Sequence, residues 1–198
     1  TDAGHITIRD AHDGDVEAAM QSASRIVEAS YYYPFVSHAN MEPQVCTAVV
    51  RDDGSIELWA PSQNPRGGRE LVASTLGIAQ EKIHVNLERI GGGFGVKQEM
   101  LIEDIVGHLT IATGRPVRLE LTREEEFMSS RTRHPQTTTF KTGVDADGKL
   151  TAQEMRVVAN TGAYGTHGLT VQMVTGLRGL SSYNSPLKRF DCKVAYTN

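Results

Sequence analysis

Apolar and polar residues alternate along several stretches of this chain, which is the pattern expected of β-strands. Two pairs of such stretches flank an Asp-Gly sequence, at Asp53-Gly54 and at Asp147-Gly148, and this arrangement is typical of tight hairpins. The sequence therefore predicts a largely antiparallel strand content. The predicted strands are residues 6–9, 25–33, 46–50, 55–60, 82–90, 117–121, 136–144, 150–158 and 190–196.

Apolar residues three and four positions apart predict helices in the remaining segments. Asp15 is placed to cap the first helix, Pro65 suits a first helical position, and Thr122 with Glu125 matches a capping box. The predicted helices are residues 15–20, 65–76, 99–113, 122–127 and 169–180. The 99–113 helix is expected to be mostly buried through Met100, Leu101, Ile105, Leu109 and Ile111.

Paired strands dominate this pattern and a strict β-α-β alternation is absent, so the predicted fold class is α+β, with antiparallel hairpins and packed helices. A length of 198 residues suits one domain with a substantial core. The chain begins abruptly and ends within a predicted strand, which suggests a piece of a larger domain, truncated at its C-terminus.

Composition limits the classes of function. Hydrophobic residues make up 39% and charged residues 22%, as in soluble globular proteins, and a net charge of -4 gives no electrostatic footprint for nucleic acid. No apolar run approaches the roughly 18 residues of a membrane span. Without a leader sequence, Cys46 and Cys192 are expected to be free thiols in the cytoplasm.

The glycine loop, residues 91–98, is the strongest functional candidate. Its four glycines let the backbone approach a ligand closely, and a strand before it with a helix after it would present backbone N–H groups to an anion. Neither the Walker spacing nor the dinucleotide Gly-x-Gly-x-x-Gly spacing fits. A tight turn that binds no ligand is the alternative.

Two other polar segments are candidates. Gln63 and Asn64 lie between a predicted strand and a helix, where loops carry binding groups; the alternative is an ordinary helix cap by Ser62 or Asn64. His38 and Glu42 are two possible metal ligands, but two are too few for a site, and a buried histidine bonded to backbone is the favoured interpretation.

Several short motifs occur together and in order along the chain. They are His38 with Met41-Glu42-Pro43, Ser62-Gln63-Asn64, Gly91-Gly92-Gly93-Phe94-Gly95 with Lys97, Thr113-Gly114-Arg115-Pro116-Val117, Arg131 with Arg133-His134-Pro135, Asp147-Gly148 and Gly162-Ala163-Tyr164. Taken together, these motifs resemble the molybdenum hydroxylase family of xanthine dehydrogenases and aldehyde oxidases. The resemblance is to the N-terminal part of the molybdenum cofactor-binding domain in the molybdopterin-binding large subunit, and it covers nearly the whole chain.

The resemblance implies roles at particular positions. Gln63 and Phe94 would approach the molybdenum from opposite sides, and Gly92, Gly93 and Gly95 would help hold molybdopterin. None of these side chains would bind the metal directly. The family's general base is a glutamate in a Gly-x-Gly-Glu motif, which this sequence lacks, so the catalytic base is expected downstream and the isolated fragment is expected to be inactive.

The implied reaction is hydroxylation of a purine, another N-heterocycle or an aldehyde, with water as the oxygen source. Iron-sulfur clusters and FAD would lie in partner subunits or domains. Purine-oxidising relatives carry a substrate-binding glutamate where this sequence has Gln98, and Val174 stands where an arginine is expected, which leaves the substrate open, although some bacterial relatives also have glutamine there. A non-catalytic binding or assembly module and a nucleotide-binding protein are the alternatives.

Overall fold

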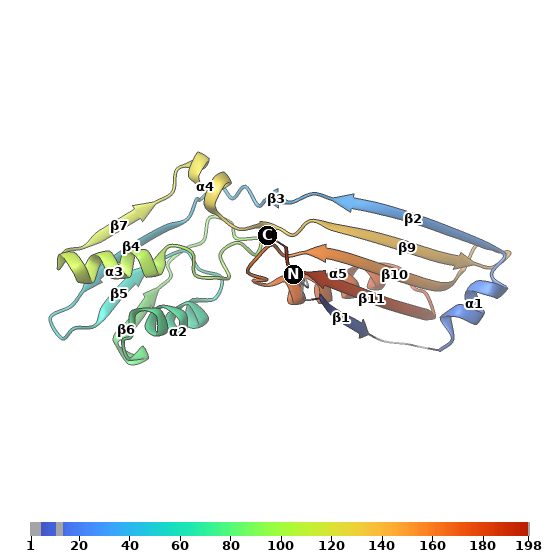
Figure 1. The fold of residues 1–198 in the computed structure, drawn as a ribbon, viewed down its shortest axis with the longest axis horizontal. Helices are drawn as coiled ribbons and strands as arrows, with labels where there is room; N and C mark the ends of the chain where they lie inside the picture. The colour runs from blue at the N-terminus through green and yellow to red at the C-terminus, as the bar shows by residue number, and fades with distance from the viewer. Residues whose placement is uncertain (1–4, 11–13, 198) are drawn as a thin grey trace. The chain divides into compact units, whose positions relative to one another are not determined.

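The computed structural model describes residues 5–10 and 14–197, with side chains from residue 14 onward. The chain forms two compact units, one comprising Thr1–Val36 and His134–Asn198, and the other Ser37–Arg133 (Figure 1). We call them the five-stranded unit and the four-stranded unit after their main sheets. Among the described residues, none of the helices combines the length and apolar character needed to cross a membrane.

The five-stranded unit consists of one sheet with two helices. Its strand order is β1-β11-β10-β9-β2, and every neighbouring pair is antiparallel except β10 and β11. Helix α5 lies between these two parallel strands in sequence and packs on them through Leu180, against Met155 and Phe190. The elements are β1 (His5–Asp10), α1 (Val16–Ser22), β2 (Arg25–Tyr33), β9 (Gln136–Val144), β10 (Leu150–Asn160), α5 (Gly168–Ser181) and β11 (Leu187–Ala195).

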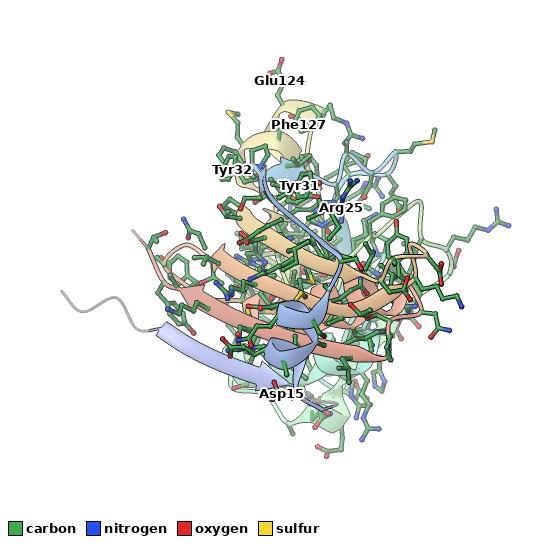
Figure 2. The ribbon with its side chains drawn as sticks, turned by 90° about the vertical axis from the view of Figure 1, so that its right-hand side faces the viewer. Asp15, Arg25, Tyr31, Tyr32, Glu124 and Phe127 are labelled. Carbon is green, nitrogen blue, oxygen red and sulfur yellow. The ribbon has the colours of Figure 1, made fainter. Side chains whose placement is uncertain are left out.

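A local signal explains where α1 begins. Asp15 accepts a hydrogen bond from the Ala18 amide at 2.9 Å and so caps α1, as predicted. Figure 2 shows Asp15 at the start of α1, and Arg25, Tyr31 and Tyr32 along β2. The predicted strand 25–33 is confirmed residue for residue, and it forms one edge of the sheet.

The four-stranded unit places two helices on one face of a sheet with strand order β6-β5-β4-β7. Its core joins Cys46, Leu58 and Ile83 of the sheet to Val72 of α2 and Val106 of α3. The elements are β3 (Val36–Ser37), β4 (Val45–Val50), β5 (Ile56–Trp59), α2 (Pro65–Leu76), the 3-10 helix η1 (Gln80–Lys82), β6 (Ile83–Asn86), α3 (Glu103–Thr113), β7 (Val117–Glu120), α4 (Arg123–Ser129) and β8 (Thr132–Arg133), with β3 paired to β8.

The predicted α+β class and both hairpins are confirmed, and the five-stranded and four-stranded sheets each also contain one parallel pair, β10 with β11 and β5 with β6. Asn64, not Ser62, caps α2, and Thr122 with Glu125 forms the predicted capping box. Both cysteines are free and buried. Burial raises the pKa of Cys46 to about 12, with the charge of Glu103 adding to it, and burial raises the pKa of Cys192 to about 11.

The segment around the glycine loop differs from the prediction. Strand β6 ends at Asn86 instead of residue 90, and α3 begins at Glu103 instead of residue 99. The predicted buried face was wrong for Ile105, Leu109 and Ile111, which are almost half exposed, whereas Met100 and Leu101, which precede α3, are partly buried against the core. The buried helix positions are Val106, Gly107 and Thr110.

The physical reason is close packing by small residues on the inner side of α3. A Cβ on Gly107 would lie 2.9 Å from the Leu76 side chain of α2, so glycine leaves room for Leu76 in its present position. Thr110 donates a hydrogen bond to the Ala48 carbonyl at 3.3 Å, which satisfies its hydroxyl inside the core. Large apolar residues do not mark the inner face here.

We predict that Gly176→Ala destabilises the five-stranded unit. A Cβ at this position in α5 would lie 2.6 Å from the ring of buried Phe190, and overpacking of this kind costs about 1–3 kcal/mol, more than alanine's helix propensity returns. Gly68→Ala in α2 is the control, because its nearest neighbour would be the Ser62 hydroxyl at 4.0 Å. Thermal unfolding of the full-length protein should show a lower transition temperature for Gly176→Ala only; equal transition temperatures would contradict the packing argument.

Candidate functional site

The glycine loop connects β6 to α3 through a chain of unusual backbone conformations. Gly92 and Gly95 have φ values of 99° and 107°, which side chains rarely allow. Phe94 between them also has a positive φ, of 52°, although it is not glycine, and its side chain is 66% exposed. An aromatic residue held in a strained conformation and facing solvent is a feature found at binding sites.

Glu42 attaches one end of the loop to the segment before β4. Its backbone amide donates to the Gly91 carbonyl at 3.1 Å, and its carboxylate Oε2 accepts from the Gly91 amide at 2.7 Å. A Cβ on Gly91 would lie only 2.4 Å from the Glu42 Cβ. The first glycine of the loop is therefore required by this close approach, and not by a turn.

Lys97 attaches the other end of the loop to the same residue. Its side chain is fully buried, and its Nζ donates to the Glu42 carboxylate at 2.7 Å and to the Glu42 carbonyl at 3.0 Å. Burial acts to raise the pKa of Glu42, but the hydrogen bonds from Lys97 and Gly91 and the charge of Lys97 together hold that pKa below its usual range. A single carboxylate thus joins both ends of the loop, because Gly91 and Lys97 share its Oε2.

Gln63 supports the middle of the loop. Its backbone amide donates to the Lys97 carbonyl at 2.7 Å, and its side-chain Oε1 accepts from the Gly95 amide at 2.9 Å. Because Oε1 must face this N–H donor, the Nε2 group of the same amide points the other way. A Cβ on Gly93 would lie 2.4 Å from Oε1, so Gly93 leaves the space that the Gln63 side chain occupies.

The predicted residues Gln63, Gly92, Gly93, Phe94 and Gly95 therefore come together. Within the described part of the chain, the amides of Gly92, Gly93 and Phe94 donate no hydrogen bond to protein, and neither does Gln63 Nε2. These donors around an exposed aromatic ring suit a polar, oxygen-rich ligand. The arrangement fits a molybdopterin group.

One predicted contribution to this site is corrected. The N-terminus of α3 was expected to present amides to an anion, but the Glu103 carboxylate accepts hydrogen bonds from the Leu101 and Ile102 amides at 2.8 and 3.0 Å. The negative charge that suits this helix end is therefore supplied by the chain itself.

Other candidates from the sequence lie around the loop. Gln98 is exposed, and its backbone amide donates to the Gly95 carbonyl at 3.2 Å. The neighbouring Glu99 forms an ion pair with Arg131 at 3.0 Å. The two possible metal ligands have other surroundings. Glu42 is bonded to Lys97, and His38 lies near Gly95, where an added Cβ would be 3.7 Å from the imidazole Nε2.

Sequence reasoning missed the structural roles of Asn40 and Arg123. Asn40 is 1% exposed and lies beside Gly92, and both polar atoms of its side chain lack a hydrogen-bond partner among the described residues. Arg123 of α4 donates to the backbone carbonyls of Asn40 and Met41, which fixes the segment carrying Glu42. The only signal in the sequence was that Asn40 directly precedes the Met41-Glu42-Pro43 motif; Arg123 is 82 residues from Met41, and nothing in the sequence linked the two.

The sequence profile of the molybdopterin cofactor-binding domain matches residues 1–198, the whole chain. The chain belongs to this family. The resemblance to molybdenum hydroxylases predicted from the sequence motifs is thereby confirmed.

Relatives of this molybdopterin cofactor-binding domain are much longer than the chain itself. It is 38% identical to a probable hypoxanthine oxidase of Escherichia coli over 188 residues, which are 94% of the chain and 20% of that protein. It is 32% identical to the large molybdopterin subunit of a nicotinate dehydrogenase of Eubacterium barkeri, over 93% of the chain and 44% of that subunit. The solved aldehyde oxidoreductase of Desulfovibrio gigas matches with a TM-score of 0.83 and 25% identity, over 98% of the chain and 21% of that structure.

We predict that Glu42→Gln loosens the glycine loop, because an amide replaces the carboxylate that Lys97 and Gly91 share. Losing such charge-assisted hydrogen bonds costs about 1.5–3 kcal/mol, which corresponds to roughly 10- to 150-fold less protection of the loop from hydrogen exchange. Hydrogen–deuterium exchange of peptides covering residues 90–97 in the full-length protein measures this. Glu57→Gln, which removes only the exposed pair with Arg51, should leave the loop unchanged.

The ion pair of Glu42 and Lys97 also predicts that protection of the glycine loop from hydrogen exchange depends on pH. Because the pKa of Glu42 is lower in the folded state than its ordinary value of 4.5, its contribution is present above that value and is lost as the pH falls through the folded pKa. Loop protection, corrected for intrinsic exchange, should therefore fall below pH 4.5 in the wild type and stay flat in Glu42→Gln. A parallel decline in both proteins would show that another group controls the loop.

Proposed function

We propose that this chain is the first part of the cofactor-binding domain of a molybdenum-dependent oxidoreductase, one that hydroxylates a purine, another N-heterocycle or an aldehyde with water as the oxygen source. The observation that carries the proposal is the glycine loop, where Phe94 is exposed under strain and the Gln63 side chain is held in one orientation by the Gly95 amide. Both units of the chain would belong to this one domain, which continues in the rest of the large subunit.

The residues of the loop have distinct roles in this proposal. The amides of Gly92, Gly93 and Phe94 hold oxygens of the molybdopterin group, and Gly95 keeps Gln63 in place through its own amide. Gln63 directs its Nε2 donors toward the metal's oxygen ligand, while Phe94 excludes water and limits the space for substrate. The cofactor, when bound, supplies the two-electron chemistry of the hydroxylation.

Other parts of the enzyme are proposed to lie outside this chain. The general base is expected in a later segment of the large subunit, since the chain spans 20% of the probable hypoxanthine oxidase that it resembles. Iron-sulfur clusters and FAD would be carried by partner subunits or domains. The name of the nicotinate dehydrogenase relative, a large molybdopterin subunit, is consistent with such a division.

Gln98 is the residue that we propose contacts substrate. It is exposed and directly follows Lys97. The buried Lys97 holds the backbone at this point, while the side-chain amide of Gln98 can donate and accept hydrogen bonds. A neutral amide suits an uncharged heterocycle or carbonyl group. The alternative function, a non-catalytic module that keeps the fold, is favoured only by the absence of a catalytic base in these residues.

We predict that Phe94→Ala and Gln63→Ala in the full-length enzyme lower turnover at least tenfold while changing stability little, because Phe94 is exposed and Gln63 is bonded only at the surface of the loop. Met128→Ala is the control, since Met128 is 79% exposed on α4 and makes no contact in the proposed site. Steady-state kinetics, molybdenum content and thermal unfolding are measured together. Normal turnover at normal molybdenum content in both variants would refute the assignment.

We also predict about one molybdenum per large subunit in the full-length protein purified with its partners, and none in residues 1–198 expressed alone. Elemental analysis of both samples, from cells that make the cofactor, measures this. The reason is that one loop offers too few contacts to retain the group. Absence of molybdenum from the full-length protein would favour the non-catalytic module.

A further inference from the structure

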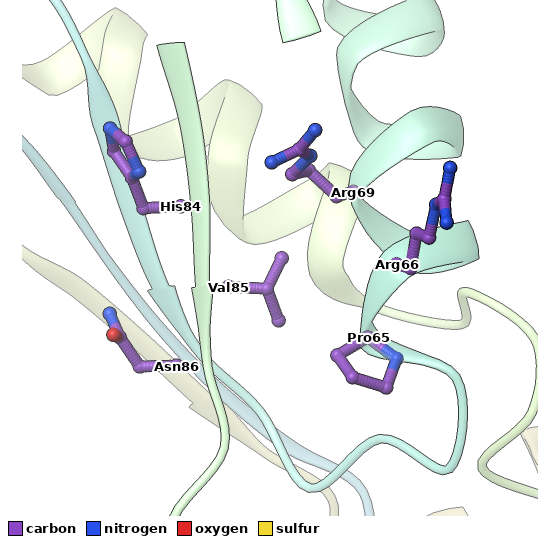
Figure 3. Close-up of a pocket in the computed structure, with 6 residues that line it drawn as sticks. All are labelled: Pro65, Arg66, Arg69, His84, Val85 and Asn86. Carbon is purple, nitrogen blue, oxygen red and sulfur yellow. The ribbon is translucent and has the colours of Figure 1, made fainter. Parts of the chain in front are cut away.

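The four-stranded unit contains a pocket between α2 and the edge strand β6, which is lined by none of the residues 91–98 of the glycine loop. It has a volume of about 490 Å³, which is within the range of roughly 300–1,000 Å³ typical of small-molecule sites. Figure 3 shows Arg66 and Arg69 extending from α2 and Val85 pointing toward that helix from β6. The lining residues are Pro65, Arg66, Arg69, His84, Val85 and Asn86.

The two arginines are the cationic groups of this pocket. They lie three positions apart, so they project from the same side of α2. The Nε of Arg69 is buried and has no hydrogen-bond partner among the described residues. Arg66 faces Glu70 at 3.7 Å, but both side chains are largely exposed, so this contact neutralises little of its charge.

The position of these arginines is unfavourable for the helix itself. They lie within the first five residues of α2, close to its positive N-terminal end, where acidic residues are preferred. The first turn of α2 contains no acidic residue that would offset them. The unfavourable interaction of the two arginines with this helix end would be offset by an external anion bound in the pocket.

Polar groups of β6 complete the pocket. In the described sheet β6 pairs only with β5, so its outer backbone edge faces the pocket without a strand partner. His84 and Asn86 lie on the other side of β6 from Val85 (Figure 3). The two guanidinium groups carry the permanent positive charge of the pocket and are its main anion-binding groups.

We propose that this pocket binds a small molecule that bears a phosphate group. Two guanidinium groups carry two positive charges, which match a phosphate of about −1.5 to −2 better than a carboxylate of single charge. The planar donors of arginine fit phosphate oxygens in pairs, and Arg66 and Arg69, which both line the pocket, carry such donors. This site is separate from the glycine loop and does not depend on the function proposed for it.

The test uses the full-length protein with its partner subunits. Inorganic phosphate and pyrophosphate are titrated by calorimetry at constant ionic strength, with acetate as the carboxylate comparison. We expect saturable phosphate binding that Arg66→Gln/Arg69→Gln weakens at least tenfold, that Arg66→Lys/Arg69→Lys weakens less, and that Arg115→Gln, an exposed arginine elsewhere in the unit, leaves unchanged.

Two outcomes would overturn the proposal. One is the absence of saturable phosphate binding to the wild type, as expected if another segment of the enzyme fills the pocket. The other is binding to the double glutamine variant within about twofold of wild type, which would place the phosphate elsewhere. Circular dichroism of each variant checks that α2 is retained.

Discussion

The buried ion pair between Lys97 and Glu42 is the interaction on which the glycine loop depends. An ammonium group with no solvent exposure is stable only when its charge is matched and its donors are bonded, and Glu42 provides both through its carboxylate and its carbonyl. The same carboxylate accepts from Gly91. Positive φ angles at three loop residues can persist because both ends of the loop are fixed to one side chain.

The sequence predicted most elements of the fold because their signals are local. The caps at Asp15 and Thr122 and the two Asp-Gly turns depend on residues a few positions apart, and they appear where predicted. The inner face of α3 could not be predicted in this way. There Gly107 faces Leu76 of α2 and Thr110 faces Ala48 of β4, and these partners, distant in sequence, determine what fits.

The candidate site shows the same division. The glycines and Phe94 were recognisable from their composition and from the family resemblance, and they do lie beside Gln63. The roles of Glu42 and Lys97 were not recognisable, because a glutamate before a proline and a lysine two residues after a glycine are usually exposed to solvent. Only the fold shows that Lys97 is buried and that Glu42 is its partner.

The contacts that shape the glycine loop link residues far apart in the chain. Glu42 is 49 residues from Gly91 and 55 from Lys97, and Gln63 is 32 residues from Gly95. Contacts of this kind exist only when strands β4, β5 and β6 hold these segments together. The loop therefore takes its shape from the whole four-stranded unit, and any group that the loop holds would be bound by that folded unit and not by a local segment of the chain.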